Sequence, residues 1–180
     1  TVNTGLFSEV IVATDSQEIY DEITSNGGKA FMSIGEHESG TDRIAEAAAT
    51  IDVSIIVNVQ GDTPFVTKDP LEKLLHEFND ASVQVASLMQ PLTDPELISD
   101  PNYVKVAVDI NFNSLFFSRS VIPYPRNKQI AIPYYEHIGV YAFRKSALLE
   151  FTSWPITPLE DAEKIECLRY LENGVPLRMV

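Results

Sequence analysis

The sequence predicts an α/β fold in which a mostly parallel, wound sheet is followed by a mixed α+β second layer. Short apolar runs at 10–13, 29–34 and 55–59 alternate with two stretches that favour helix. Continuous apolar runs are typical of strands buried on both faces, and their alternation with helices is typical of parallel sheets. After residue 80 the pattern changes, because apolar runs follow one another with few helical stretches between them.

Local signals place the first three helices. Asp15, with Glu18 three residues later, predicts a capping box for a helix that ends at Asn-Gly-Gly 26–28. Thr41 is expected to cap an alanine-rich helix at 42–50. Pro70 is expected at the first position of a third helix, since proline is favoured there.

The second half is expected to hold strands joined by turns and two helices. Thr157 and Glu160 have the spacing of a capping box, with proline between them at the first helical position, and they predict a helix that runs to Glu172. A hairpin turn is expected at 109–114, and a helix at 144–151. The expected strands are 83–89, 103–108, 115–117, 137–143 and 175–180.

Composition limits the class of protein. The 180 residues are 44% apolar and carry 13 Lys and Arg against 26 Asp and Glu, a net charge of −13. This length suits one domain, 1–180, and the acidic balance argues against nucleic acid as a partner. No apolar run is long enough for a membrane span. The single cysteine, Cys167, is expected to pack in the interior and indicates a reducing cytoplasm.

Asp62 is the first candidate for chemistry. It follows the apolar run 55–59 through Gln60 and Gly61, and ligands of wound sheets bind beyond the carboxyl ends of strands. A carboxylate there is placed to hold Mg²⁺, which prefers oxygen ligands and bridges phosphates. The alternative is that Gly-Asp-x-Pro forms an ordinary turn that Asp62 caps.

A second candidate is the start of the helix after residue 38. Ser39, Thr41 and Arg43 lie where free backbone N–H groups and the helix dipole attract anions. The alternative is a Thr41 cap beside a solvated Arg43, and it is favoured when the segment is considered alone.

Further candidates come from the second half. Arg119 could bind a carboxylate or phosphate, or form an ordinary ion pair. His137 and Tyr141, four apart on a strand, share a face and could contact a polar ligand or pack as core. Glu163 and Glu166 are expected as neighbours on one helix, where their like charges repel unless a ligand or arginine compensates.

Six stretches in order resemble the 3-deoxy-manno-octulosonate cytidylyltransferase family, over nearly the whole chain. The stretches are Ile-Val-Ala-Thr-Asp at 11–15, Ser-Gly-Thr-Asp-Arg at 39–43, Val-Asn-Val-Gln-Gly-Asp at 57–62, Phe-Ser-Arg-Ser-Val-Ile-Pro at 117–123, His-Ile-Gly-Val-Tyr at 137–141, and 158–169.

The resemblance implies a GT-A-like nucleotidyltransferase fold and a cytoplasmic homodimer. The implied reaction is Mg²⁺-dependent attack of a hydroxyl of the acidic sugar Kdo on the α-phosphate of CTP, which gives CMP-Kdo and pyrophosphate for lipopolysaccharide biosynthesis. Asp62 matches the family's catalytic, metal-binding Asp. The implied substrate-binding residues, nucleotide side first, are Ser39, Thr41, Arg43, Gln60, Arg119, His137, Tyr141 and Glu166.

The chain departs from the family pattern at both ends and at two residues. The family's Gly-rich phosphate segment is expected before Thr1 and its closing Gly-x-Asp-Thr-Pro segment after Val180, and a chain without them is not expected to catalyse. Thr63 replaces a usual Glu, and Cys167 replaces a usual Gln in the sugar pocket. The alternatives are transfer to amino-Kdo or a sialic acid, a non-catalytic nucleotide-binding module, or a structural α/β domain.

Overall fold

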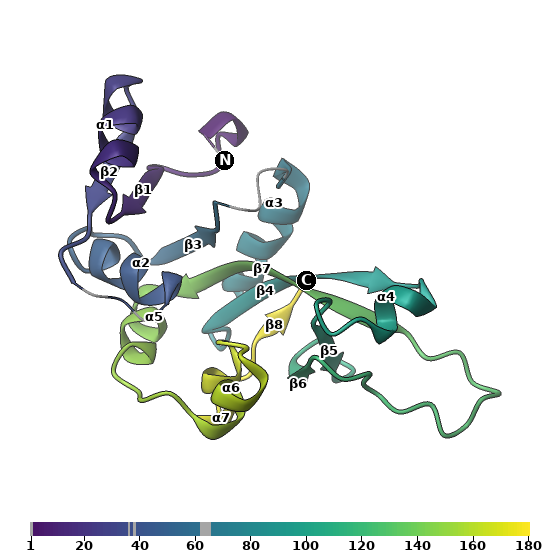
Figure 1. Cartoon of the computed structure of the whole chain (residues 1–180). Helices are drawn as coiled ribbons and strands as arrows, with labels where there is room; N and C mark the ends of the chain where they lie inside the picture. The colour runs from purple at the N-terminus through teal and green to yellow at the C-terminus, as the bar shows by residue number, and fades with distance from the viewer. Residues whose placement is uncertain (1, 36, 38, 62–65) are drawn as a thin grey trace.

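The computed structural model describes residues 2–35, 37, 39–61 and 66–180 (Figure 1). Short 3₁₀ turns at Val2–Thr4 and Glu77–Asn79 accompany the regular elements. The elements are, in chain order, β1 (Ile11–Thr14), α1 (Gln17–Ser25), β2 (Lys29–Met32), α2 (Gly40–Ala49), β3 (Ile55–Val59), α3 (Lys68–His76), β4 (Val85–Leu92), α4 (Pro95–Ser99), β5 (Lys105–Val108), β6 (Ser114–Ser118), β7 (Tyr134–Arg144), α5 (Lys145–Phe151), α6 (Pro158–Glu163), α7 (Leu168–Glu172) and β8 (Arg178–Met179).

The long strand β7 is the axis of the main sheet. Along one edge it pairs antiparallel with the whole of β4, and along the other with β3 and, at one residue pair, β5. Among the described residues, parallel pairing joins β1 to β2 and β4 to β8. The α/β class and the mixed second half are confirmed. The expectation that the third apolar run extends a parallel sheet is wrong, because β3 pairs antiparallel with β7.

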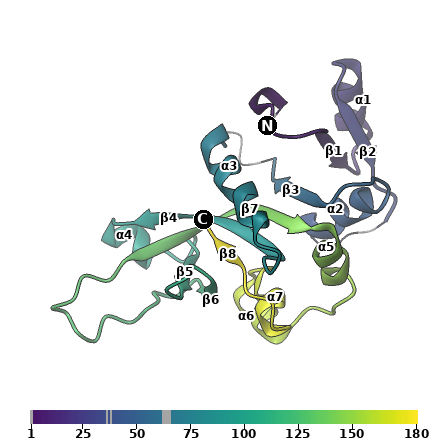
Figure 2. The same cartoon turned by 180° about the vertical axis from the view of Figure 1, so that it is seen from behind.

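Helices cover both faces of this sheet (Figures 1 and 2). Alternate residues of β7 point to opposite faces, so that Tyr141 and Phe143 join the core under α2, α5 and α7. Val140 and Ala142 join a second core that is closed by Leu71 and Leu74 of α3. No helix among the described residues is long and apolar enough to cross a membrane.

Two helices begin at a different residue from the predicted one. Ser16, rather than Asp15, is the N-cap of α1, and its hydroxyl accepts a hydrogen bond from the N–H of Ile19. Ser39, rather than Thr41, caps α2 and accepts from the N–H of Asp42. Both predictions failed because adjacent residues were equally good caps by type. As a result, Thr41 lies inside the first turn of α2, where it is buried.

Two helices around β4 also differ from the prediction. α3 begins at Lys68 after the N-cap Thr67, so that Pro70 is its third residue rather than its first. The short helix α4 was not predicted. Its signal was present, because Asp94 caps it and Pro95 is its first residue.

The helix expected from residue 158 to 172 is broken in two. Its start is confirmed, since Thr157 and Glu160 form the capping box. Lys164 then adopts a left-handed backbone conformation (φ 52°), which ends α6, and α7 begins at Leu168. This break places Glu166 and Cys167 in the turn between the two helices.

Candidate active site

His137 and Tyr141 of β7 lie on one face of the sheet, as predicted. Their ring centroids are 5.3 Å apart with an interplanar angle of 61°, and the Phe117 ring packs against the other side of His137 at 4.9 Å. Ser87, on the neighbouring strand β4, is fully buried, and its Oγ lies 3.0 Å from Nε2 of His137.

The contacts of Ser87 relate its hydrogen bonding to the tautomer of His137. Besides Nε2, the hydroxyl has the carbonyl oxygens of Ile138 at 3.1 Å and Val140 at 3.0 Å within reach. A hydroxyl carries one proton, so donation to a carbonyl requires Nε2–H to donate to Oγ. In that arrangement Nδ1 is a hydrogen-bond acceptor, whereas donation from Oγ to Nε2 makes Nδ1–H a donor. Burial lowers the pKa of His137 to about 4, and the ring is therefore neutral at pH 7.

The turn between α6 and α7 brings Glu166 to the start of α2. Burial raises the pKa of the Glu166 carboxyl, while the nearby hydroxyls of Thr41 and Ser39 lower it. Thr41 Oγ1 has no hydrogen-bond partner among the described residues, and Ser39 Oγ donates to Asp42 Oδ2 at 2.9 Å. The Asp42 carboxylate nearby also raises this pKa. The first turn of α2 thus already interacts with two carboxyl groups, and it offers hydroxyls rather than an empty anion site.

Tyr141 and Cys167 connect the two parts of the site. Burial raises the pKa of both side chains, and each also interacts with the other, so both are neutral at physiological pH. Cys167 is buried, as expected for a packing role. The structure therefore brings together Ser39, Thr41, Tyr141 and Glu166, with His137 packed against Tyr141.

Three of the predicted site residues, Arg43, Gln60 and Arg119, lie elsewhere. The guanidinium of Arg43 forms an ion pair with Asp15, just beyond the end of β1. Its Nε is buried without a hydrogen-bond partner among the described residues. Gln60 is exposed at the tip of β3.

Arg119 and Glu163 form a cluster of their own. The carboxylate of Glu163 accepts hydrogen bonds from the hydroxyl of Ser118 at 2.6 Å and the backbone N–H of Arg119 at 2.9 Å. The predicted proximity of Glu163 and Glu166 on one helix is wrong, because the turn at Lys164 separates them.

The predicted metal ligand, Asp62, and Thr63 lie outside the described residues. Within the described ranges, no group of three or more His, Cys, Asp or Glu side chains is arranged to hold a metal ion. A Cβ built on Gly61, the last described residue before Asp62, would meet no atom of the described residues within 4 Å. Mg²⁺ is usually held by one or two carboxylates and the substrate's phosphates, so an Asp side chain is the type of ligand that this ion takes.

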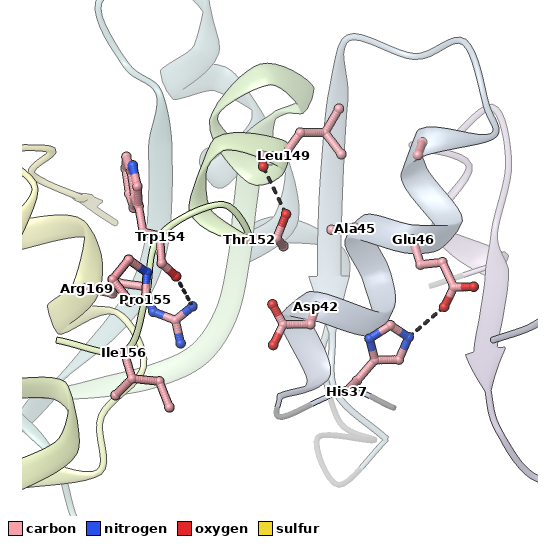
Figure 3. Close-up of a pocket in the computed structure, with 11 residues that line it drawn as sticks. His37, Asp42, Ala45, Glu46, Leu149, Thr152, Trp154, Pro155, Ile156 and Arg169 are labelled. Carbon is pink, nitrogen blue, oxygen red and sulfur yellow. Dashed lines mark hydrogen bonds and ion pairs between the residues drawn. The ribbon is translucent and has the colours of Figure 1, made fainter. Parts of the chain in front are cut away.

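A groove of about 600 Å³ lies beside the cluster that contains Tyr141 and Glu166 (Figure 3). It lies between α2 and the segment that follows α5, with Asp42 on one side and Arg169 on the other. On the α2 side, His37 Nε2 lies 2.6 Å from Glu46 Oε2. Asp42 and Arg169 both act on the Glu166 carboxyl, so the groove adjoins the cluster that contains Glu166.

Sequence reasoning missed two buried polar residues of this face. Ser87, the partner of His137, was hidden in a run read only as a strand, although a single hydroxyl in an apolar run was a usable signal. Asn58 of β3 stands opposite Tyr141 in the strand register. Its Nδ2 is buried and has no hydrogen-bond partner among the described residues.

The lowered pKa of His137 predicts a pH-dependent stability. Between the unfolded pKa of about 6.5 and the folded pKa of about 4, the unfolded chain binds a proton that the folded chain does not. The free energy of unfolding contributed by this group therefore falls as pH decreases, by about 2 kcal/mol between pH 7 and 5. Urea unfolding at both pH values should show a smaller loss for His137→Gln than for the exposed-site control His76→Gln. Equal losses would contradict the neutral, buried imidazole.

The chain is similar to known proteins of one family. The profile of the cytidylyltransferase family matches residues 1–177. The 3-deoxy-manno-octulosonate cytidylyltransferase of Flavobacterium johnsoniae is 57% identical, over 99% of this chain and 75% of its own length. The protein of the same name from Christiangramia forsetii is 52% identical, over 99% of this chain and 73% of its own length.

Solved structures agree with these relatives. A structure of CMP:2-keto-3-deoxy-manno-octonic acid synthetase complexed with CTP has a TM-score of 0.93 and 37% identity, and the match covers 99% of this chain and 74% of that one. A 4-diphosphocytidyl-2C-methyl-D-erythritol synthase from Anaerococcus prevotii, at 13% identity and a TM-score of 0.59, shares the fold. The chain belongs to the cytidylyltransferase family, among the 3-deoxy-manno-octulosonate cytidylyltransferases.

Proposed function

We propose that the protein transfers CMP from CTP to Kdo, giving CMP-Kdo and pyrophosphate for lipopolysaccharide biosynthesis. The observation that carries this proposal is the structural similarity, with a TM-score of 0.93, to the CMP:2-keto-3-deoxy-manno-octonic acid synthetase that was solved in complex with CTP. The chain's own side chains support it, because the cluster around Tyr141 suits a molecule with many hydroxyl groups.

The described residues act by binding and orienting the sugar. Nδ1 of the neutral His137 forms a hydrogen bond with a sugar hydroxyl, which can donate or accept, while Ser87 holds the ring through Nε2. The hydroxyls of Ser39 and Thr41 and the carboxyl of Glu166 provide further partners of both kinds. Such a site works by fixing the attacking hydroxyl next to the α-phosphate rather than by covalent catalysis.

Mg²⁺ is the proposed cofactor, with Asp62 as its protein ligand. When bound, the ion neutralises phosphate charge and makes the α-phosphate more susceptible to attack. Gln60 and Gly61, between the end of β3 and Asp62, lie beside the nucleotide in this proposal, and Arg43 near the end of β1 faces its phosphates.

We also propose a homodimer that works in the cytoplasm. The loop at 119–133 extends away from the sheet (Figure 1), and it exposes the apolar side chains of Val121, Tyr124 and Ile130. Exposed apolar groups gathered on one segment favour contact with another chain. Sedimentation velocity should give twice the monomer mass, whereas a monomer at micromolar concentration would contradict the dimer. The acidic charge and single buried cysteine support a cytoplasmic location.

The sugar is tested by supplying the purified protein with CTP, Mg²⁺ and one acidic sugar at a time. Kdo should give the highest kcat/KM, with CMP-Kdo identified by mass spectrometry. Amino-Kdo and N-acetylneuraminic acid are the comparison sugars, because Cys167 stands in the pocket where the family usually has Gln. A higher kcat/KM for either of them would identify that sugar as the substrate in place of Kdo. CTP binding without any product would favour a non-catalytic binding module.

A further inference from the structure

Two charged residues, the buried Lys105 and the half-buried Glu163, lie outside the cluster around Tyr141. The Lys105 ammonium donates hydrogen bonds to the carbonyl oxygens of Asp100 at 2.9 Å and Arg119 at 2.7 Å, and its side chain has no solvent exposure. Burial lowers the pKa of Lys105, and the negative charges of Asp100 and Glu163 oppose that decrease. A buried lysine is costly unless it is paired in this way.

The guanidinium of Arg119 is used for contacts within the fold. Nε donates to the carbonyl oxygen of Glu163 at 2.7 Å, Nη2 to that of Lys164 at 3.3 Å, and Nη1 to that of Pro101 at 3.0 Å. Glu163 is the last residue of α6 and Lys164 is its C-cap, whereas Pro101 follows α4. Side chain and backbone of Arg119 thus hold the end of α6 against the end of β6.

The same turn carries Glu166. Lys164 has the left-handed conformation, and only Ile165 separates it from Glu166. Arg119 binds the backbone carbonyl oxygens of both Glu163 and Lys164, so it holds the backbone just before Glu166.

We call Lys105, Arg119 and Glu163 the anchor. The strand pair β5–β6, which carries Lys105 and leads into Arg119, also supports His137. The backbone N–H of His137 donates to the carbonyl oxygen of Val104 at 2.8 Å, one residue before Lys105. The ring of Phe117, one residue before Ser118, packs against the imidazole. The anchor thus lies between the two halves of the site, β7 on one side and the α6–α7 turn on the other.

We propose that Lys105, Arg119 and Glu163 are positioning residues that hold Glu166 in the sugar-binding geometry, and that Arg119 does not contact the substrate. The expected change in the KM for the sugar rests on the proposed function. The expected change in the reactivity of Cys167 can be measured without it. Loss of the anchor should weaken sugar binding and leave nucleotide binding intact, because the anchor contacts the turn that carries Glu166.

The test compares Glu163→Gln with the control Asp161→Asn. Glutamine preserves the volume of Glu163 but removes the charge that faces Lys105. Asp161 lies on the same helix and forms only an exposed ion pair with Lys164. The KM for the sugar should rise about tenfold in Glu163→Gln, in line with a lost hydrogen bond to a charged group. The Kd for CTP should stay within about twofold, and the control should match the wild type. If Glu163→Gln fails to fold, Arg119→Lys, which keeps the charge but loses the planar fork, is used instead.

A second readout does not require catalysis. Cys167 is the single cysteine, it is buried, and it follows Glu166 directly. Its modification rate by a thiol reagent should rise about tenfold in Glu163→Gln and remain at the wild-type rate in Asp161→Asn. Unchanged sugar KM and thiol reactivity would overturn the proposal, as would equal losses of sugar and CTP binding. Faster thiol modification in a protein that turns over no acidic sugar would support the anchor and reject the proposed function.

Discussion

Replacement of Asp62 by Asn is expected to lower kcat/KM for CMP transfer about a thousandfold. Asparagine has nearly the same shape, but it lacks the charge that would hold Mg²⁺ against the triphosphate in the proposed site. The protein would then have to neutralise the developing phosphate charge with fewer groups. This loss is large because a displacement at phosphorus is catalysed mainly by positioning and charge neutralisation.

Magnesium titrations of CTP binding by calorimetry, together with initial rates, would measure this effect. The apparent Mg²⁺ affinity should fall along with the rate. Asp69→Asn is the matched control, since Asp69 is an exposed carboxylate in the first turn of α3, just after the β3–α3 connection. If Asp62→Asn retained both the Mg²⁺ dependence and the rate, Asp62 would be a turn residue and not a ligand.

Replacement of Glu160 by Gln is expected to lower the free energy of unfolding by about 3 kcal/mol. Glu160 and Arg169 form a buried bidentate pair, with Nε to Oε2 at 2.7 Å and Nη2 to Oε1 at 2.6 Å. Arg169 also lies over the Phe151 ring at 4.1 Å. Hydrogen bonding and the charge of Glu160 raise the pKa of Arg169, so glutamine leaves a buried cation without its counter-charge.

Urea unfolding at pH 7 measures this loss of stability. The exposed pair of Asp161 and Lys164 offers the control, and Asp161→Asn should change the free energy of unfolding by less than about 1 kcal/mol. A double variant, Glu160→Leu with Arg169→Met, should recover part of the loss because it removes both charges. Similar midpoints for Glu160→Gln and Asp161→Asn would show that the buried pair is not a main stabilising contact.

The strands and several helices could be predicted from local pattern, but their pairing could not. The apolar run Ile55–Val59 has the same bounds in the structure, and the capping box of Thr157 and Glu160 is present. Whether β3 pairs parallel with one strand or antiparallel with β7 depends on contacts far apart in sequence. Local preference also does not predict the left-handed Lys164, since it favours a continuous helix to Glu172.

The site shows the same division. Placement of His137 and Tyr141 on one face follows from the strand period. The approach of Glu166 to Thr41 and the separation of Glu163 from Glu166 depend on the break at Lys164, which no local pattern indicated. Arg119 was assigned to the substrate by its charge, but its donors are directed at carbonyl groups of the turn. The role of Ser87 became visible only when β4 was placed beside β7.

The most direct measurement of the central claim is ³¹P NMR of the purified protein with CTP, Kdo and Mg²⁺. The account predicts that the CTP signals are replaced in equal amounts by a phosphodiester signal of a CMP-sugar and by pyrophosphate, with no orthophosphate released by the protein. Formation of CDP and orthophosphate, or of free CMP in place of the sugar conjugate, would contradict attack of the sugar hydroxyl on the α-phosphate.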